Sequence, residues 1–309
     1  MFRLFFLKIF NLPENSSIII FQGGLGNQLF QYYLGEELRN SYNKNVTYFD
    51  LGNSYKSRHN SKVQNIFNLK INKYILNKNN FIIKNLFLSP IILKICKFIY
   101  QKTHIQIFSN LYIDFDNKPI NLNTILSKRG ITIFFGTWHN LINKYKLNFD
   151  QLNIKFLTQE INFPKLNLNK DFISLHVRRG DYVNNKKTSI FHGNLKISYY
   201  LKAVNILRQK FGNLPVYLFS DDHQWLKENL FILISNSVVI SSDNIPAEID
   251  FCIMSKGRHF IISNSTFAWW SAFFSPNKNK YIILPKFWFS KFSINSNYIF
   301  KDWNYEIIE

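Results

Sequence analysis

The sequence predicts an α/β protein built around parallel sheets. Three observations support this prediction: short apolar runs of strand length recur, segments with apolar residues at helical spacing follow them, and polar residues stand just after the runs. Regular alternation of strand and helix in the second half is typical of a doubly wound sheet, in which ligands bind off the carboxyl ends of the strands.

Length and composition set the first bounds. The 309 residues suffice for one large or two ordinary domains, and 46% hydrophobic residues are ample for a packed core. The balance of 38 Lys and Arg against 19 Asp and Glu favours acidic partners such as nucleotides, nucleic acid or anionic lipid. The lysines are scattered and Asn, Lys and Ile abound, which indicates compositional drift, so we do not expect a nucleic-acid partner. Two distant cysteines, Cys96 and Cys252, exclude a disulfide framework and fit a reducing compartment.

Residues 1–15 are expected to form an N-terminal extension. Residues 1–10 are apolar but include Arg3 and Lys8, are too short to span a bilayer, and lack a small-residue cleavage site. We therefore expect a cytoplasmic protein that is not secreted. The apolar segment could also lie on the inner face of the membrane, which would make the protein peripherally membrane-associated.

The first domain, expected at residues 16–161, begins with a strand at 17–21. The loop Gln22–Gln28 contains three glycines and opens a segment with helical spacing, so free N–H groups at the helix start could bind an anion. A plain tight turn is the alternative, because the loop matches neither the dinucleotide fingerprint nor a Walker A loop. Further strands are expected at 46–50 and 131–135.

Trp138 and His139 stand just past strand 131–135. They could line a sugar pocket, because aromatic faces stack on sugar C–H surfaces, or the tryptophan could simply pack at a domain edge. Residues 60–112 carry no motif and are expected to form helices and loops.

A polar segment with one proline, residues 162–170, is the expected linker to a second domain at 171–290. The expected strands of that domain are 172–177, 215–219, 238–240, 260–262 and 281–284. The expected helices are 198–211, 223–229, 247–255 and 267–274. Residues 291–309 are expected to form a tail that packs on the domains.

Charged and polar side chains follow the strands of the second domain: Arg178, Arg179, Asp181, Ser220, Asp221, Asp222, Asn264, Ser265 and Thr266. Two arginines after one strand could be a structural Arg–Asp pair or an anion site, since an unpaired buried charge is costly and the guanidinium fork matches phosphate oxygens. Because the strand ends converge, we predict a phosphate or diphosphate site.

Transfer of a group from a nucleoside diphosphate fits this site better than phosphoryl transfer. Asp221, Asp222 and Asp250 lie in different elements, so we expect no bound metal, and cations would stabilise the leaving diphosphate instead. Asp250 could accept two hydrogen bonds from a guanine edge, or it could be a helix-surface acid stabilised by the helix dipole.

Four segments, in this order, resemble the alpha-1,2-fucosyltransferase family, glycosyltransferase family 11: residues 23–32 (GGLGNQLFQY), 175–183 (LHVRRGDYV), 219–222 (FSDD) and 261–270 (IISNSTFAWW). The resemblance implies a GT-B-like fold, in which two Rossmann-like domains face a cleft. The N-terminal domain would lie on the acceptor side, and the C-terminal domain would bind GDP-L-fucose.

The resemblance also implies roles for single residues. Arg178 and Arg179 would bind the diphosphate, His176 and Asp250 the guanine, and Ser265 and Thr266 a phosphate. Ser220, Asp221 and Asn264 complete the expected donor site, and Gly24, Gly26, Asn27 and Gln28 the lip of the cleft. Trp138 and His139 belong to the acceptor side, where the sequence departs from the family. The general base could be Asp181 or His192, although Asp181 could equally brace an arginine.

We therefore expect an inverting, metal-independent galactoside alpha-1,2-fucosyltransferase of surface polysaccharide or lipopolysaccharide synthesis. Its substrates would be GDP-L-fucose and a galactose-terminated oligosaccharide, with no cofactor. The alternatives are a fucosyltransferase of another linkage and a non-catalytic protein that binds nucleotide sugars or polyanions.

Overall fold

The computed structural model describes residues 13, 15–50, 63, 73–74, 111–113, 121–126, 132–141, 171–290, 292–294 and 296–309. The chain divides into two compact units, residues 1–153 and 154–309. The expected linker at 162–170 and nearly all of the expected N-terminal extension lie outside the described residues. So does most of the segment 60–112.

Unit 1 contains a parallel five-stranded sheet with the order β3-β2-β1-β5-β4. Its strands are β1 (Ser16–Phe21), β2 (Asn45–Asp50), β3 (Lys73–Tyr74), β4 (Leu111–Ile113) and β5 (Thr132–Phe135). Its described helices are α2 (Leu25–Tyr42), α6 (Leu122–Leu126) and the 3-10 turn η3 (His139–Leu141). The expected strands at 17–21, 46–50 and 131–135 are confirmed, to within one residue at their ends.

The glycine loop between β1 and α2 forms as the sequence predicts. Gly23 has a φ of 74°, in the left-handed region that glycine adopts without strain, and α2 begins two residues later. The helix ends where Asn43 takes the left-handed conformation. The three isoleucines of β1 are fully buried beneath this helix and the neighbouring strands.

Unit 2 contains a parallel six-stranded sheet with the order β13-β10-β9-β6-β7-β8. Its strands are β6 (Ile173–Val177), β7 (Val216–Ser220), β8 (Ser237–Val239), β9 (His259–Ile261), β10 (Tyr281–Pro285) and β13 (Asn304–Ile308). Its helices are α7 (Gly180–Asn184), α8 (Lys186–His192), α9 (Ile197–Phe211), α10 (His223–Trp225), α11 (Ala247–Ser255) and α12 (Thr266–Phe273). A short hairpin, β11 (Phe287–Phe289) and β12 (Phe292–Ser293), follows β10.

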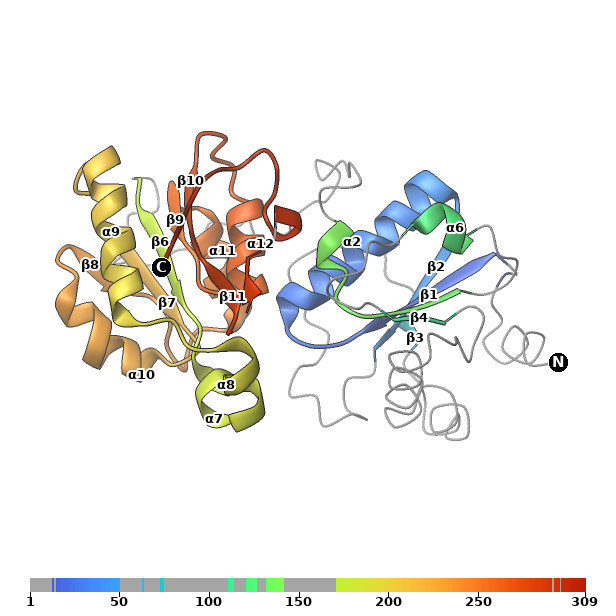
Figure 1. The fold of residues 1–309 in the computed structure, drawn as a ribbon, viewed down its shortest axis with the longest axis horizontal. Helices are drawn as coiled ribbons and strands as arrows, with labels where there is room; N and C mark the ends of the chain where they lie inside the picture. The colour runs from blue at the N-terminus through green and yellow to red at the C-terminus, as the bar shows by residue number, and fades with distance from the viewer. Residues whose placement is uncertain are drawn as a thin grey trace. The chain divides into compact units, whose positions relative to one another are not determined.

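Helices cover both faces of this sheet (Figure 1). Ile173, Leu175 and Val177 of β6 face α9 in a common apolar core. The alternate residues of β6 face the other way, where the Ser174 hydroxyl donates to the carbonyl of Met254 in α11. His176 therefore lies on the same side of the sheet as α11 and α12.

The strand order of unit 2 is that of a doubly wound sheet that starts at β6, runs outward through β7 and β8, and then resumes on the other side at β9. The direction of winding reverses between β6 and β9. Ligands of such sheets bind at this switch point, beyond the carboxyl ends of the strands. In unit 1 the corresponding reversal falls between β1 and β5.

Three parts of unit 2 differ from expectation, in addition to the hairpin β11–β12, which was not predicted. The segment expected to be a tail contains β13, which pairs with β10 and is an edge strand of the same sheet. The helix expected at 223–229 is three short pieces: α10, a π-helical turn (Leu226–Leu230) and a 3-10 turn (Phe231–Leu233). Helices α7 and α8 were not predicted, because neither carries an apolar stripe of useful length.

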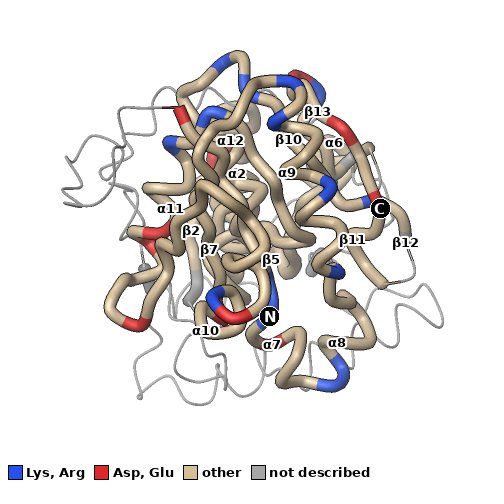
Figure 2. The backbone as a smooth tube through the Cα atoms, turned by 90° about the vertical axis from the view of Figure 1, so that its left-hand side faces the viewer, with Lys and Arg blue, Asp and Glu red and all other residues tan. Residues whose placement is uncertain are grey.

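Lys and Arg residues are spread over many elements of the described chain and form no single stripe there (Figure 2). Among the described helices, none combines the length and apolarity that a membrane crossing requires.

Candidate active site

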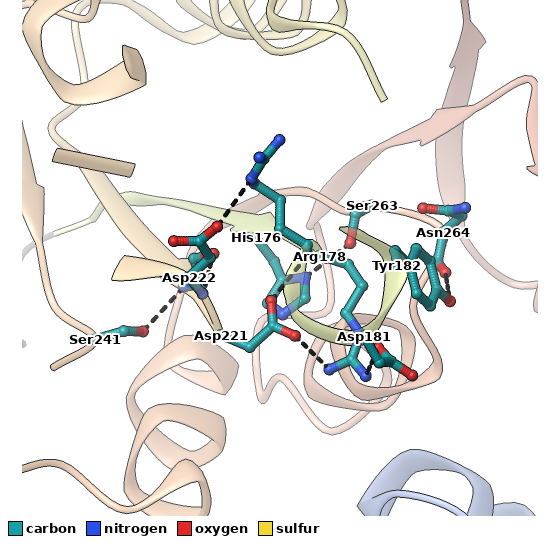
Figure 3. Close-up of polar contacts among 11 residues, drawn as sticks. His176, Arg178, Asp181, Tyr182, Asp221, Asp222, Ser241, Ser263 and Asn264 are labelled. Carbon is teal, nitrogen blue, oxygen red and sulfur yellow. Dashed lines mark hydrogen bonds and ion pairs between the residues drawn. The ribbon is translucent and has the colours of Figure 1, made fainter. Parts of the chain in front are cut away.

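Arg178 and Arg179 follow β6 directly, at the switch point of unit 2, and three aspartates hold their guanidinium groups. Nη1 of Arg178 lies 2.8 Å from Asp221 Oδ2, and Nη2 donates to Asp181 Oδ1 at 2.6 Å (Figure 3). Nε of Arg179 donates to Asp222 Oδ2 at 3.1 Å. The structural Arg–Asp pairing is therefore present, and an anion would join a cluster whose charges are already compensated.

Both guanidinium groups remain partly exposed. The side chain of Arg178 is 25% exposed and that of Arg179 is 20% exposed, and the latter lies over the ring of Trp225 at 4.0 Å. Burial alone would lower the pKa of Arg178, but the carboxylates of Asp221 and Asp181 outweigh it and raise the pKa. The pair is permanently cationic, and each guanidinium has N–H groups beyond those already engaged.

Asp222 has two tasks. Its Oδ2 pairs with Arg179, while its Oδ1 accepts a hydrogen bond from the N–H of Trp225 and caps α10. The neighbouring Ser220 hydroxyl accepts from the Asp222 N–H at 3.0 Å, so the end of β7 forms one connected turn. Asp222 therefore holds the Arg179 side chain, and Ser220 holds the backbone of Asp222.

His176 is buried, and its Nδ1 lies 2.8 Å from the hydroxyl of Ser263 in a hydrogen bond that joins the ends of β6 and β9 (Figure 3). Burial and the charge of Arg178 lower the pKa of His176 to about 3. The imidazole is therefore neutral at neutral pH, with one N–H donor and one acceptor nitrogen.

Asp250, in the first turn of α11, is 8% exposed. Its Oδ2 accepts a hydrogen bond from Ser241, and no described residue donates to its Oδ1. Burial raises the pKa of this carboxyl to about 7. The helix-surface alternative is thus excluded, and a buried acceptor oxygen without a described donor stands on the same side of the sheet as His176.

Ser241 connects this carboxyl to the end of β7. Its hydroxyl donates to Asp250 and accepts from the backbone N–H of Ser220 at 3.0 Å. Sequence reasoning missed Ser241, because a lone serine after a short strand carries no local signal; its place beside Asp250 depends on the sheet order.

His192, at the end of α8, lies in an aromatic stack. Its ring is parallel to that of Tyr182 at 4.5 Å, and the guanidinium of Arg178 lies 5.3 Å from the same tyrosine ring. Burial lowers the pKa of His192 to about 4, and no described residue bonds its Nδ1. The two candidate bases differ in charge and surroundings. Asp181 is 40% exposed and paired with Arg178, whereas the His192 imidazole is neutral and stacked on Tyr182.

Asn264 ties three segments together. Its side-chain amide donates to the carbonyls of His192 at 2.9 Å and Trp288 at 3.3 Å, and its own carbonyl accepts from Tyr182 Oη at 3.1 Å. Ser265 caps the N-terminus of α12 without a side-chain hydrogen bond to the helix, and Thr266 is its first residue. Backbone N–H groups at this helix start lie beside the switch point, which suits an anion.

The predicted acceptor-side residues lie in unit 1. Gln28 Nε2 donates to the Gly23 carbonyl at 3.0 Å, and the backbone N–H of Asn27 donates to the Gly24 carbonyl at 3.0 Å. Both bonds tie the glycine loop to the first turn of α2, which contains Gly26. Trp138 is fully buried, which matches the packing alternative, and its φ of 63° is rare for a bulky residue. His139 is also buried and packs on Phe30.

Gln31 joins the two loops at the switch point of unit 1. Its side-chain amide donates to the Gly136 carbonyl at 2.8 Å and to the Gln22 carbonyl at 3.2 Å, while its oxygen accepts from the Gln22 N–H. The signal that could have identified this role is a polar residue, Gln31, between the aromatic residues Phe30 and Tyr32 of α2. Donor-site and acceptor-site assignments for all these residues stay predictions.

Known proteins that resemble this chain belong to the family that the four sequence segments indicated. Residues 132–307 match the family model described as Glycosyl transferase family 11. The chain is 30% identical over 286 residues to the alpha-1,2-colitosyltransferase of Escherichia coli, covering 89% of this chain and 92% of that protein. It is 36% identical over 149 residues to the O-antigen biosynthesis glycosyltransferase WbnK of Escherichia coli, 47% of this chain and 48% of that one.

More distant matches include the galactoside alpha-(1,2)-fucosyltransferase 2 of Rattus norvegicus, 29% identical over 36% of this chain and 32% of that protein. Among solved structures, a mutant of FUT1 of Arabidopsis thaliana in complex with GDP superposes with a TM-score of 0.52 at 12% identity. That match covers 87% of this chain and 70% of the other and supports the predicted fold class.

Proposed function

The chain belongs to glycosyl transferase family 11, and on this premise we propose that it transfers L-fucose from GDP-L-fucose to the 2-hydroxyl of a terminal galactoside. Family membership confirms the resemblance found from four sequence segments. The observation that carries the proposal is the placement of two guanidinium groups, a buried neutral imidazole and a buried carboxyl at the carboxyl end of the unit 2 sheet. Arg178, Arg179 and His176 lie at the end of β6, and Asp250 is joined through Ser241 to the end of β7.

The site supplies complementary groups for each part of a guanosine diphosphate. Arg178 and Arg179 present N–H groups to the diphosphate oxygens, and the start of α12 adds backbone donors. The Oδ1 atom of Asp250 can accept from the N1–H and the amino group of guanine, which no other common base offers together. His176 would contact the base from the same side of the sheet.

Transfer would be a single displacement at C1 of the fucose. The acceptor oxygen forms a bond to C1 as the bond from C1 to the β-phosphate oxygen breaks, which converts the β-linked donor to an α-linked product. Arg178 neutralises the charge that develops on the departing GDP. The acceptor proton passes to a base, for which Asp181 and His192 are the candidates, and then to solvent.

The proposal includes the absence of a metal requirement. Among the described residues there is no group of three or more His, Cys, Asp or Glu side chains placed to hold an ion. Activity in the presence of EDTA, compared with activity after addition of Mg²⁺ or Mn²⁺, tests this part separately.

Arg178→Ala tests the phosphate role. Loss of a charge that acts on the leaving group should reduce turnover about a hundredfold or more, and Arg178→Lys should also be poor because the planar fork is lost. Arg258→Ala is a matched control, because Arg258 precedes β9 at the opposite end of the strands. Near-normal turnover of folded Arg178→Ala would refute the role.

A second donor has specific support. The alpha-1,2-colitosyltransferase of Escherichia coli matches over 92% of its own length and 89% of this chain. Colitose is the 3-deoxy counterpart of L-fucose. Incubation with GDP-fucose or GDP-colitose and a panel of galactosides, followed by NMR of the product linkage, decides between them. Tight GDP binding with neither hydrolysis nor transfer would favour a non-catalytic binding protein. A role in surface polysaccharide synthesis at the membrane is part of the proposal.

A further inference from the structure

Both carboxylate oxygens of Asp221 are engaged with the arginine pair. Oδ2 lies 2.8 Å from Nη1 of Arg178, and Oδ1 accepts the backbone N–H of Arg179 at 2.9 Å. We propose that Asp221 is a positioning residue that presents Arg178 to the diphosphate, an inference that rests on the proposed function. Asp221 would act through the arginine and would not itself touch the donor.

Asp221 is the better fixed of the two partners of Arg178. It stands at the end of β7, next to β6 in the sheet, and the Arg179 N–H holds its other oxygen. Asp181 lies on the short helix α7, three residues from Arg178, and its side chain is 40% exposed. The rigid anchor of the guanidinium is therefore the carboxylate from the neighbouring strand.

Gly180 makes this arrangement sterically possible. A Cβ added to Gly180 would collide with Oδ2 of Asp221, the oxygen that pairs with Arg178. The glycine is the first residue of α7, where its conformation is compatible with other residues. A glycine is needed here because the Asp221 carboxylate occupies the space of a Cβ, so an alanine would force Asp221 away from Arg178.

Simple electrostatics and the positioning role predict opposite changes in GDP affinity when the Asp221 charge is removed. A carboxylate beside a diphosphate repels it, so removal of the Asp221 charge alone would strengthen GDP binding. If Asp221 instead fixes Arg178, its removal leaves a mobile side chain that must be ordered when the diphosphate binds. The cost of that ordering weakens binding by about three- to tenfold.

The experiment measures GDP affinity by calorimetry for wild type, Asp221→Asn and Gly180→Ala. Asparagine keeps the size of the side chain and an oxygen for the Arg179 N–H. Both variants should bind GDP about three- to tenfold more weakly. Asp243→Asn is the matched control, because Asp243 is an 89% exposed acid that pairs with His223 outside this cluster; its affinity should equal that of wild type.

A double-mutant cycle separates positioning from general damage. In an Arg178→Ala background, Asp221→Asn should cause no further loss, because the group it positions is gone. Unchanged or tighter GDP binding by Asp221→Asn beside a weakened Arg178→Ala would overturn the positioning role alone. The same loss with and without Arg178 would also overturn it. Wild-type binding by Arg178→Ala would instead remove the phosphate role on which the proposed function depends.

Discussion

Replacing Asp250 with asparagine should weaken GDP binding and at the same time stabilise the ligand-free protein. The carboxyl is buried, Ser241 donates to Oδ2, and no described residue donates to Oδ1. Ionisation in this setting is unfavourable, which is why burial raises the pKa to about 7. Bound guanine would supply the donors that the carboxylate lacks.

The cost to stability follows from the pKa values. An ordinary aspartate has a pKa of 3.8, so a pKa of about 7 corresponds to about 4 kcal/mol at ~1.4 kcal/mol per pH unit. The folded protein keeps a proton that the unfolded chain loses near pH 4. The stability contributed by this group therefore falls as pH rises from about 4 to about 7 and is fully lost above that. Asparagine carries no such cost, so the variant should be more stable at pH 8, with an advantage that shrinks toward acid pH.

Binding should respond in the opposite direction. Oδ1 of Asp250 would accept from guanine while Oδ2 accepts from Ser241, so an asparagine loses the charge and must present a mismatched N–H group to either the guanine or Ser241. Loss of a charge-assisted hydrogen bond costs about 2 kcal/mol, which is roughly thirtyfold in affinity. Wild-type affinity should also fall as pH drops below about 7, because the bound form needs the carboxylate, and the variant should lack this pH dependence.

Calorimetric titration with GDP at pH 6, 7 and 8, with thermal unfolding at the same pH values, measures both effects. Asp243→Asn serves as the exposed control and should change neither. Equal GDP affinity of wild type and Asp250→Asn at pH 8 would refute the base contact. A variant less stable than wild type at pH 8 would refute the account of an uncompensated buried carboxylate.

Three further predictions concern other parts of the chain. His192→Phe keeps a ring against Tyr182 but removes both nitrogens. If His192 is the base, turnover falls about a hundredfold with GDP affinity unchanged; an unchanged rate would exclude His192 and leave Asp181. Gly35→Ala should destabilise unit 1 by about 1–3 kcal/mol in thermal unfolding, because its Cβ collides with the Tyr48 hydroxyl, and added Tyr48→Phe should restore part of the loss. The pKa of His176 is about 3, so the stability that the neutral imidazole contributes is complete above pH 6.5 and is lost as pH falls toward 3. His176→Asn should therefore lose less stability than wild type on acidification. Acid unfolding curves that run parallel for the two proteins would contradict this.

Local signals were sufficient for strands β6 to β10 and for helices α9, α11 and α12 of unit 2. The apolar run at β6 and the stripe on α9 are set by burial, which acts on residues two or four positions apart. They were insufficient for α7 and α8, which are short and largely polar, and for β13. That edge strand is half exposed, and only its pairing with β10 identifies it.

The site divides in the same way. Arg178, Arg179 and Asp221 could be found from the sequence, because parallel strands place their carboxyl ends at one edge and charged residues stand out after apolar runs. Ser241, the pairing of Ser263 with His176 and the burial of Asp250 could not be found. Each depends on contacts between segments that are distant in the chain, such as the hydrogen bond between His176 and Ser263 across 87 residues.

The sequence by itself determined the alternation of strand and helix, the family motifs and the set of residues at the strand ends. Only the tertiary structure decided which of those ends are neighbours. Strand order is a property of non-local pairing, and local periodicity carries no record of it. Because β6 lies between β7 and β9, Asp221 reaches Arg178 from one side and Ser263 reaches His176 from the other.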